Sequence, residues 1–432
     1  MRGKDRRILL LLLDGAADRT APALDGRTPL EAADTPNLDR LTAAGINGQM
    51  DVSAPGTPLS SDRAHTILFG YDLAEVPGRG VLEARGFGRD PKPGSVVCSA
   101  SFAELDGPTI VDRHLPGDAA DFPALAEREG VARVETTEAT VSFEYTWKNR
   151  GLVTVESPNT LSPDVTDVDP FATGFPVLAA EPLADAADPD AAERTASALR
   201  TYTRRTREVL ADAGEPLGRT EKSPADVVLS KWAGAPTKPE PFRERHGLDA
   251  ASLTPKPVLT GLARTLGITH EDPPEGYDAR ADAALAAVEA NEFVHVHYPE
   301  PDEVSHAAGP AAKRDELEAI DASLEPVVER ALADPKLVTV VTADHTTPST
   351  EDVVHSGEPV PLTVAAESVR TDDVTATGER PAAGGGLGRV RGRDFLRIAR
   401  SAADRVLLDG LRRSPRVPDY PTREVRPLWP EE

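Results

Sequence analysis

The hydrophobic run at residues 8–13, which ends at Asp14, constrains the fold of this chain more than any other segment. A short, uninterrupted run of Ile and Leu is typical of a strand buried on both faces of a parallel sheet. Its six residues are fewer than the apolar region of a typical signal peptide contains, and no small-residue cleavage site follows them. No stretch approaches the ~20 apolar residues that cross a membrane. We therefore expect a soluble protein with a buried parallel strand near its start.

Beyond residue 241 the chain alternates between strand-like and helical segments. The strand-like runs lie at 248–253, 293–297 and 337–343, and the helical segments at 257–266, 278–290 and 313–333. We expect Pro326 to kink or break the last helix. Strands that alternate with helices predict an α/β fold with a mainly parallel sheet, covered by helices on both faces.

Residues 76–240 differ from the segments on either side of them. Short β-like runs are separated by turns rich in Pro, Gly and Asp, and one long helical pattern follows at 191–210. We expect an inserted α+β domain over residues 76–240. The core domain would then be discontinuous, formed by residues 1–75 and 241–432.

Side chains of the kinds that bind metal ions follow the predicted strands. They are Asp14, Asp302, His306, Asp344, His345 and His355. Ligands of open α/β sheets bind beyond the carboxyl ends of the strands. Because carboxylates and imidazoles suit divalent ions such as Mn²⁺ or Zn²⁺, we expect a metal site there.

Taken singly, each of these residues has a simpler interpretation, such as an ordinary turn at Asp14 or a hydrogen-bonded loop histidine at His345. The joint pattern favours a site, because five of the nine histidines fall between residues 295 and 355. Of these five, His295 and His297 alternate with valines on a predicted strand. We interpret these two as packing or supporting residues.

A serine at the start of a predicted helix adds a possible nucleophile. Ser60 and Ser61 could each be the N-cap of a helix that begins near residue 61, and spacing does not choose between them. A helix N-terminus favours the negative charge of a phosphate, and a metal ion activates a bound hydroxyl. Two ions beside a serine would suit phosphoryl transfer.

The charge of the chain excludes one class of partner. The formal net charge is −24, the pI is about 4.8, and only nine of the 48 basic residues are lysines. Nucleic-acid binding needs basic patches, so we expect no nucleic acid as a partner. An acidic surplus with few lysines is typical of a high-salt cytoplasm, where salt screens self-repulsion. The single cysteine, Cys98, also fits a reducing, cytoplasmic compartment.

Eight motifs occur in order along most of the chain. They are L-L-L-D-G-A-A-D-R at 11–19, G-R-T-P-L-E-A-A-D-T-P-N-L-D-R-L at 26–41, S-D-R-A-H-T-I-L-F-G-Y-D at 61–72, G-R-G-V-L-E-A-R-G at 78–86, D-V-T-D-V-D-P at 164–170, P-D-E-V-S-H at 301–306, T-A-D-H-T-T-P at 342–348 and G-G-L-G-R-V-R-G at 385–392. In this order they resemble the archaeal type of cofactor-independent phosphoglycerate mutase, within the alkaline phosphatase superfamily. The resemblance implies an alkaline-phosphatase-like core with an inserted cap, and interconversion of 3-phosphoglycerate and 2-phosphoglycerate through a phosphoserine.

The resemblance also implies a role for each residue that matches a motif. Ser61, rather than Ser60, occupies the serine of S-D-x-A-H and would be the nucleophile. One divalent ion would be held by Asp14, Ser61, Asp344 and His345, and the other by Asp302, His306 and His355. The substrate-binding residues would be His65, Arg79, Arg113 and Lys238. Mn²⁺ is the expected ion, with Zn²⁺, Mg²⁺ or Co²⁺ as alternatives.

The chain departs from the family pattern where substrate charge would be bound. Relatives often carry several arginines in the segment that reads V-D-R-H-L-P-G-D here, at 111–118, and only Arg113 remains. An arginine-containing motif is replaced at 229–238, where lysines stand at Lys231 and Lys238. Because bidentate arginines are hard to replace, a related phosphatase or phosphotransferase acting on another small phosphorylated metabolite is the alternative. A regulatory protein on a degenerate scaffold is disfavoured, since all seven implied ligands are present, and the oligomeric state stays open.

Overall fold

The computed structural model describes residues 6–211, 225–350, 353–406, 408 and 429. The chain forms two compact units. The first combines Met1–Glu75 with Pro239–Glu432, and the second is Val76–Lys238. The second unit is therefore an insertion within the first.

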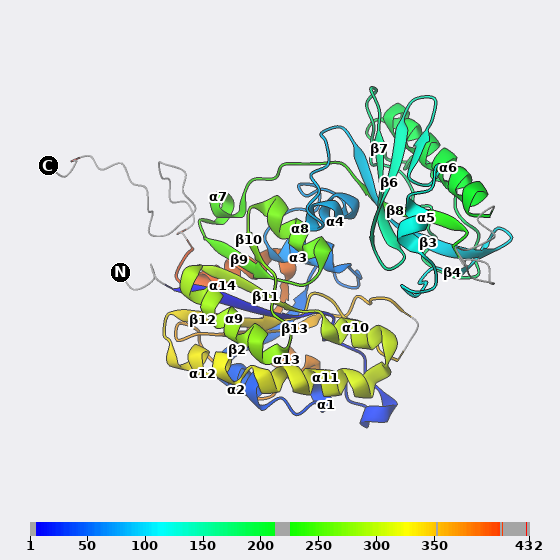
Figure 1. Ribbon diagram of the computed structural model, residues 1–432. Coiled ribbons are helices and arrows are strands. Elements are labelled where there is room, and N and C mark those ends of the chain that lie inside the picture. Colours follow the sequence, from blue (N-terminus) through cyan, green and yellow to red (C-terminus); the bar gives the residue numbers. More distant parts are fainter. Residues whose placement is uncertain (1–5, 212–224, 351–352, 407, 409–428, 430–432) are drawn as a thin grey trace. The chain divides into compact units, whose positions relative to one another are not determined.

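The first unit is built on an eight-stranded sheet in the order β10-β9-β11-β1-β12-β13-β2-β14 (Figure 1). Its strands are β1 (Arg7–Leu13), β2 (Gly45–Asp51), β9 (Ala250–Leu253), β10 (Thr269–Glu271), β11 (Phe293–Tyr298), β12 (Leu337–Thr342), β13 (Val360–Ala365) and β14 (Gly388–Arg391). Among these described strands, only β13 runs against the others. The hydrophobic run forms β1, which lies between β11 and β12 and is buried from Ile8 to Leu13. The predicted α/β core with a mainly parallel sheet is confirmed.

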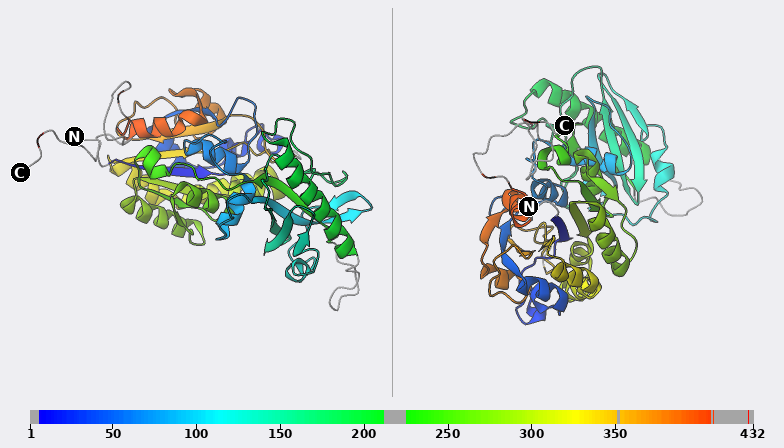
Figure 2. Two further views of the ribbon diagram at one scale, coloured as in Figure 1. Left: turned by 90° about the horizontal axis from the view of Figure 1, so that it is seen from above. Right: turned by 90° about the vertical axis from the view of Figure 1, so that its left-hand side faces the viewer.

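Helices cover both faces of this sheet (Figures 1 and 2). One face carries α2 (Pro36–Ala43), α9 (Tyr277–Ala290), α11 (Gly309–Ser323) and α12 (Glu325–Ala333), and the other carries α3 (Ser61–Leu68), α8 (Pro257–Leu266) and α14 (Gly392–Ala402). Side chains alternate along β11, so Tyr298 contacts Tyr277 of α9, whereas Phe293 contacts Phe69 beside α3. The shorter helices are η1 (Pro22–Leu24), α1 (Pro29–Ala32), α7 (Phe242–His246), α10 (Glu300–Ala307) and α13 (Glu379–Ala383).

The helix expected at 313–333 is broken in two, as Pro326 predicted. Helix α11 ends at Ser323 and α12 begins at Glu325. Pro326 is the second residue of α12. At that position the missing N–H of proline leaves no helical hydrogen bond unmade.

The second unit is an antiparallel sheet with helices packed on it. Its strands follow the order β4-β3-β7-β6-β5, and β8 pairs with β3. They are β3 (Val96–Asp106), β4 (Thr109–Asp112), β5 (Arg133–Glu135), β6 (Thr140–Trp147), β7 (Arg150–Glu156) and β8 (Val227–Gly234). The predicted long helix is α6 (Pro189–Ala211), which packs on β8, while α4 (Arg79–Gly86) packs on β3 and α5 (Phe122–Ala126) on β6. Phe102, Phe122 and Tyr202 are fully buried in the unit's own core.

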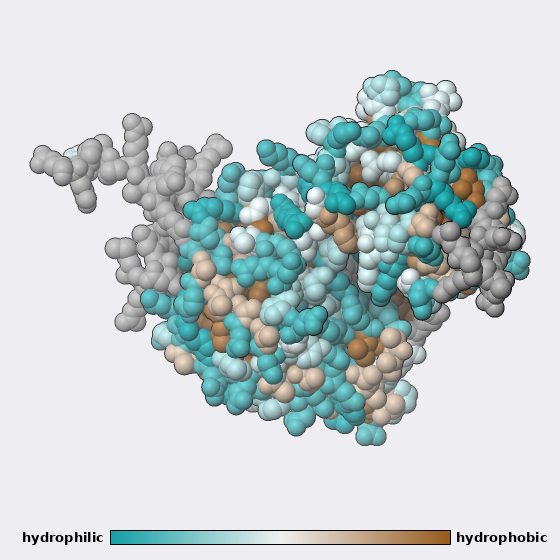
Figure 3. All heavy atoms as spheres, viewed as in Figure 1, coloured by the Kyte–Doolittle hydropathy of each residue, from teal (hydrophilic) through white to brown (hydrophobic). Residues whose placement is uncertain are grey.

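The face in Figure 3 is predominantly hydrophilic, with small apolar patches between polar side chains. This agrees with a chain in which 28% of the residues are charged. In the part of the chain that the structure describes, no helix has both the length and the apolar character of a membrane span.

Candidate functional site

Three neighbouring strands of the first unit end at one edge of the sheet, and polar residues follow each of them. Asp14 follows β1, Asp344 and His345 follow β12, and Asp302 and His306 lie on α10, which follows β11. The carboxyl ends of parallel strands meet at one edge. Residues far apart in the sequence therefore share one site.

Asp14, Asp344 and His345 form the first group of candidate metal ligands. His345 Nε2 lies 3.2 Å from Asp14 Oδ1 and 3.2 Å from Asp344 Oδ2, and all three side chains are buried. Within the described residues, Asp14 Oδ1 and Asp344 Oδ2 have no hydrogen-bond partner. Because buried carboxylate oxygens are costly unless a donor or a cation faces them, this group fits a divalent ion.

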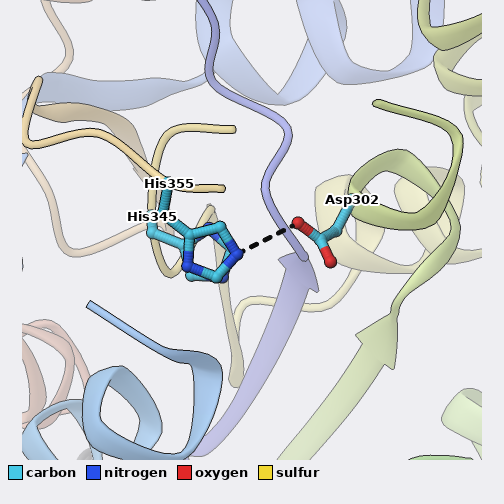
Figure 4. Close-up of side chains that lie close together, drawn as sticks. All are labelled: Asp302, His345 and His355. Atoms are coloured by element: carbon cyan, nitrogen blue, oxygen red, sulfur yellow. Dashed lines mark ion pairs between the residues drawn. The ribbon is translucent and has the colours of Figure 1, made fainter. Parts of the chain in front are cut away.

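Asp302, His345 and His355 form the second group, so His345 belongs to both. His355 Nε2 lies 3.5 Å from Asp302 Oδ1, and the rings of His345 and His355 stack with their centroids 3.7 Å apart (Figure 4). His306, one helical turn after Asp302, places its Nε2 3.3 Å from the same oxygen. The structure thus brings together all six side chains that the pattern of strand ends singled out.

The pKa values of the three carboxyl groups in the site are shifted in opposite directions. Burial favours the neutral form of Asp14, but the imidazoles of His297 and His345 outweigh it and hold the pKa of Asp14 well below its usual range. Burial, and next the charge of Asp14, raise the pKa of Asp344 well above its usual value. Burial also opposes ionisation of Asp302, yet its imidazole neighbours lower the pKa of this carboxyl. Three buried carboxyl groups this close together indicate a site that a bound cation would stabilise.

Ser61 is the first residue of α3 and lies beside the shared histidine. Its Oγ is 3.3 Å from His345 Nε2. Ser60 is the N-cap of α3, and its side chain makes no capping hydrogen bond. His65, one turn along α3, donates from Nδ1 to the Ser61 carbonyl at 2.7 Å; it is fully buried, which lowers its pKa to about 3. His65 thus holds the start of α3, and its role in binding substrate stays a prediction.

His295 and His297 support the site from within the sheet. Both are fully buried on β11. His297 Nε2 lies 2.9 Å from Asp14 Oδ2, and its Nδ1 lies 3.0 Å from Thr254 Oγ1. The interpretation of these histidines as packing or supporting residues is confirmed. No sequence signal paired His297 with Asp14, because that contact depends on β11 lying beside β1.

In the second unit, two of the predicted substrate-binding residues lie among aromatic and acidic side chains. The guanidinium of Arg79 lies 4.2 Å from the centroid of the Trp232 ring. Arg113 donates to Asp169 Oδ2 at 2.6 Å, and Lys231 donates to the same oxygen at 2.7 Å. A buried acid thus holds two cations in fixed positions.

Two further residues of this unit bear on the predicted set of substrate-binding residues. Arg150, at the start of β7, was not singled out by any motif. The residue is exposed overall, but local desolvation of its guanidinium lowers its pKa, and the nearby charges of Glu83, Arg79 and Arg113 also act on it, so Arg150 lies near the same cations. Lys238 is exposed beyond the end of β8, and no described contact joins it to that cluster.

The fold and the site together define a metalloenzyme with an α/β core. The sequence profile of the Metalloenzyme superfamily matches residues 6–400. A 2,3-bisphosphoglycerate-independent phosphoglycerate mutase from Methanopyrus kandleri is 36% identical over 428 residues, which cover 94% of this chain and 98% of that protein. The chain belongs to this family, the archaeal-type 2,3-bisphosphoglycerate-independent phosphoglycerate mutases.

Solved structures agree with this membership. A protein from Pyrococcus horikoshii superposes with a TM-score of 0.73 at 29% identity, over 94% of this chain and 100% of that one. A cofactor-independent phosphoglycerate mutase from Thermoplasma acidophilum superposes with a TM-score of 0.62 at 29% identity, over 92% of this chain and 100% of that one. The similarity therefore extends over both units.

Proposed function

We propose that this protein interconverts 3-phosphoglycerate and 2-phosphoglycerate through a phosphoserine at Ser61. The observation that carries the proposal is the position of Ser61 Oγ, which lies 3.3 Å from Nε2 of His345, the residue that both groups of candidate ligands share. Family membership supports the choice of substrate. The site chemistry supports the choice of reaction, because paired divalent ions beside a hydroxyl suit phosphoryl transfer.

The proposal includes two divalent cations, with Mn²⁺ as the first candidate and Zn²⁺, Mg²⁺ and Co²⁺ as alternatives. The residues proposed for one are Asp14, Ser61, Asp344 and His345, and those for the other are Asp302, His306 and His355. When bound, the cations would neutralise the charge of the phosphoryl oxygens. The buried, unpartnered oxygens of Asp14 and Asp344 support this assignment.

In the first step, Ser61 Oγ attacks the phosphorus of 3-phosphoglycerate while the bond between phosphorus and the C3 oxygen breaks. Ser61 loses its proton and the departing oxygen gains one, which leaves phosphoserine and glycerate. The glycerate then reorients, and its C2 hydroxyl attacks the phosphoserine. Ser61 is regenerated and 2-phosphoglycerate is released. The positive end of α3, which begins at Ser61, favours the anionic phosphoryl group.

We assign substrate binding to the cations of the second unit. They are Arg79, Arg113, Arg150 and Lys231. Asp169 already orients Arg113 and Lys231, so a substrate anion would meet donors fixed in advance. In this proposal the second unit acts as a cap that excludes water, which would otherwise hydrolyse the phosphoserine.

The chain offers a matched pair of variants as a test. Ser61→Ala removes the proposed nucleophile, and Ser60→Ala removes the neighbouring hydroxyl. Purified protein with Mn²⁺ and 3-phosphoglycerate would be followed by phosphorus NMR. We expect Ser61→Ala to lose at least ~10³-fold in mutase rate, and Ser60→Ala to stay within a few-fold of the unmodified protein. A Ser61→Ala variant that keeps most of its activity contradicts the proposal.

One observation favours a second candidate, a phosphatase or phosphotransferase for another small phosphorylated metabolite. Arg113 is the arginine that remains at 111–118, and Asp169 already pairs with it and with Lys231. Less positive charge is then left for a substrate with two anionic ends. Release of inorganic phosphate from other esters, without formation of 2-phosphoglycerate, would favour this candidate.

A further inference from the structure

We propose that Thr347 is a positioning residue that sets the ring of His345 and connects it to Asp302. The inference rests on the proposed metal site and adds a residue that contributes no ligand atom. Thr347 lies two residues after His345, in the loop that follows β12, and is fully buried. Its hydroxyl is the feature from which the role follows.

Two hydrogen bonds meet at this hydroxyl. Thr347 Oγ1 donates to Asp302 Oδ1 at 2.8 Å, and His345 Nδ1 lies 3.1 Å from Thr347 Oγ1. A hydroxyl has one proton. Since that proton points to Asp302, His345 must donate from Nδ1 to Thr347.

The direction of this bond determines what the other ring nitrogen does. A neutral imidazole that donates from Nδ1 carries its lone pair on Nε2. His345 Nε2 faces Asp14 Oδ1 and Asp344 Oδ2, each at 3.2 Å. The lone pair of Nε2 therefore faces two carboxylate oxygens, and a divalent cation would complete this set of donors, so Thr347 favours the form of His345 that binds a metal.

The backbone around Thr347 leaves its hydroxyl little freedom. The Thr347 N–H donates to Ala17 O at 3.0 Å, and the Thr347 carbonyl accepts from Lys313 Nζ at 2.9 Å. Gly15 lies beside this hydroxyl, and a Cβ atom on residue 15 would lie only 2.4 Å from Thr347 Oγ1. Glycine at residue 15 therefore makes room for the hydroxyl that bridges His345 and Asp302.

The adjacent threonine provides a matched control. Thr346 is equally buried, but its Oγ1 donates to the carbonyl of Glu358 at 3.1 Å. Thr346→Val and Thr347→Val thus make the same substitution one residue apart. Thr347→Ser keeps the hydroxyl. Thr347→Ala removes it without placing a methyl group against Asp302, should the valine variant fail to fold.

The measurement is calorimetric titration of the metal-free full chain with Mn²⁺, with circular dichroism as the check on folding. We expect Thr347→Val or Thr347→Ala to bind Mn²⁺ about 10–100-fold more weakly, and Thr347→Ser and Thr346→Val to stay within about threefold of the unmodified protein. Undiminished affinity without the Thr347 hydroxyl overturns the inference, and so does equal weakening by Thr346→Val. If the unmodified protein binds none of Mn²⁺, Zn²⁺, Mg²⁺ and Co²⁺, the proposed function itself fails.

Discussion

Removing one partner of the buried ion pair of Lys313 and Asp18 should be among the most destabilising single substitutions in the first unit. Both side chains are fully buried, and Lys313 Nζ lies 3.0 Å from Asp18 Oδ2. The ammonium also donates to the carbonyls of Ala17, at 3.2 Å, and Thr347, at 2.9 Å. It therefore joins the loop that follows β1 to the loop that follows β12.

We expect Lys313→Met to lower the free energy of unfolding by about 3–4 kcal/mol. Removing one partner of a buried pair costs ~3–5 kcal/mol. The cost falls in the lower part of that range because Asp18 still accepts from the backbone N–H groups of Arg19, at 2.6 Å, and Ser349, at 3.2 Å. The Thr347 carbonyl loses the Lys313 donor, which adds about 1 kcal/mol.

Urea unfolding of a double-mutant cycle measures this energy. Asp18→Asn removes the opposite charge. The loss of unfolding free energy in the double variant should be about 2 kcal/mol smaller than the sum of the losses in the two single variants. Arg314→Met is the control, since Arg314 is the next residue on α11 and pairs with Asp315 in a more exposed position; its effect should lie within ~0.5 kcal/mol. A loss below about 1 kcal/mol for Lys313→Met, or strict additivity in the cycle, refutes the reasoning.

Three further predictions concern the site and its surroundings. Gly15→Ala should lower the free energy of unfolding by urea more than Gly26→Ala does. Both glycines have positive φ, at 59° and 72°, which accounts for ~1–2 kcal/mol in each variant, but only the new Cβ at residue 15 would meet atoms within 4 Å. Equal losses in the two variants would contradict a steric clash at residue 15. Removing bound metal with a chelator should lower the midpoint temperature of unfolding, and added Mn²⁺ should restore it. Mn²⁺ at a hundredfold excess over Kd would add about 2.7 kcal/mol to the free energy of unfolding. A midpoint that responds to neither treatment argues against a metal site. Burial lowers the pKa of His246 from 6.5 to about 3, so between these two pH values the unfolded chain binds a proton that the folded chain does not, and stability falls as the pH is lowered. His246→Gln should reduce the slope of the free energy of unfolding against pH by up to ~1.4 kcal/mol per pH unit. An unchanged slope would assign the pH dependence of stability to other groups.

The elements of the first unit followed closely from local patterns. The run at 8–13 became β1, and the helix expected at 257–266 has those same limits. The break at Pro326 also followed, because a proline acts on its own helical turn. Strand β13 was not predicted, and nothing in its residues indicates that it runs against its neighbours.

The candidate site was predicted in its residues but not in its connections. Side chains at the ends of buried strands stand out because a polar group there needs a partner. That His345 belongs to two groups, that His297 reaches Asp14, and that Thr347 bridges to Asp302 followed only from the structure.

The sequence by itself determined that β1, β11 and β12 are strands, where these strands end and which kinds of ligand stand there. These follow from hydrophobic periodicity, helix signals and side-chain chemistry, which act over a few residues. The tertiary structure alone decided which of those side chains meet, and that Arg150 joins the cations of the second unit. Such contacts join residues that lie far apart in the chain, so they depend on strand order and register, which no local pattern specifies.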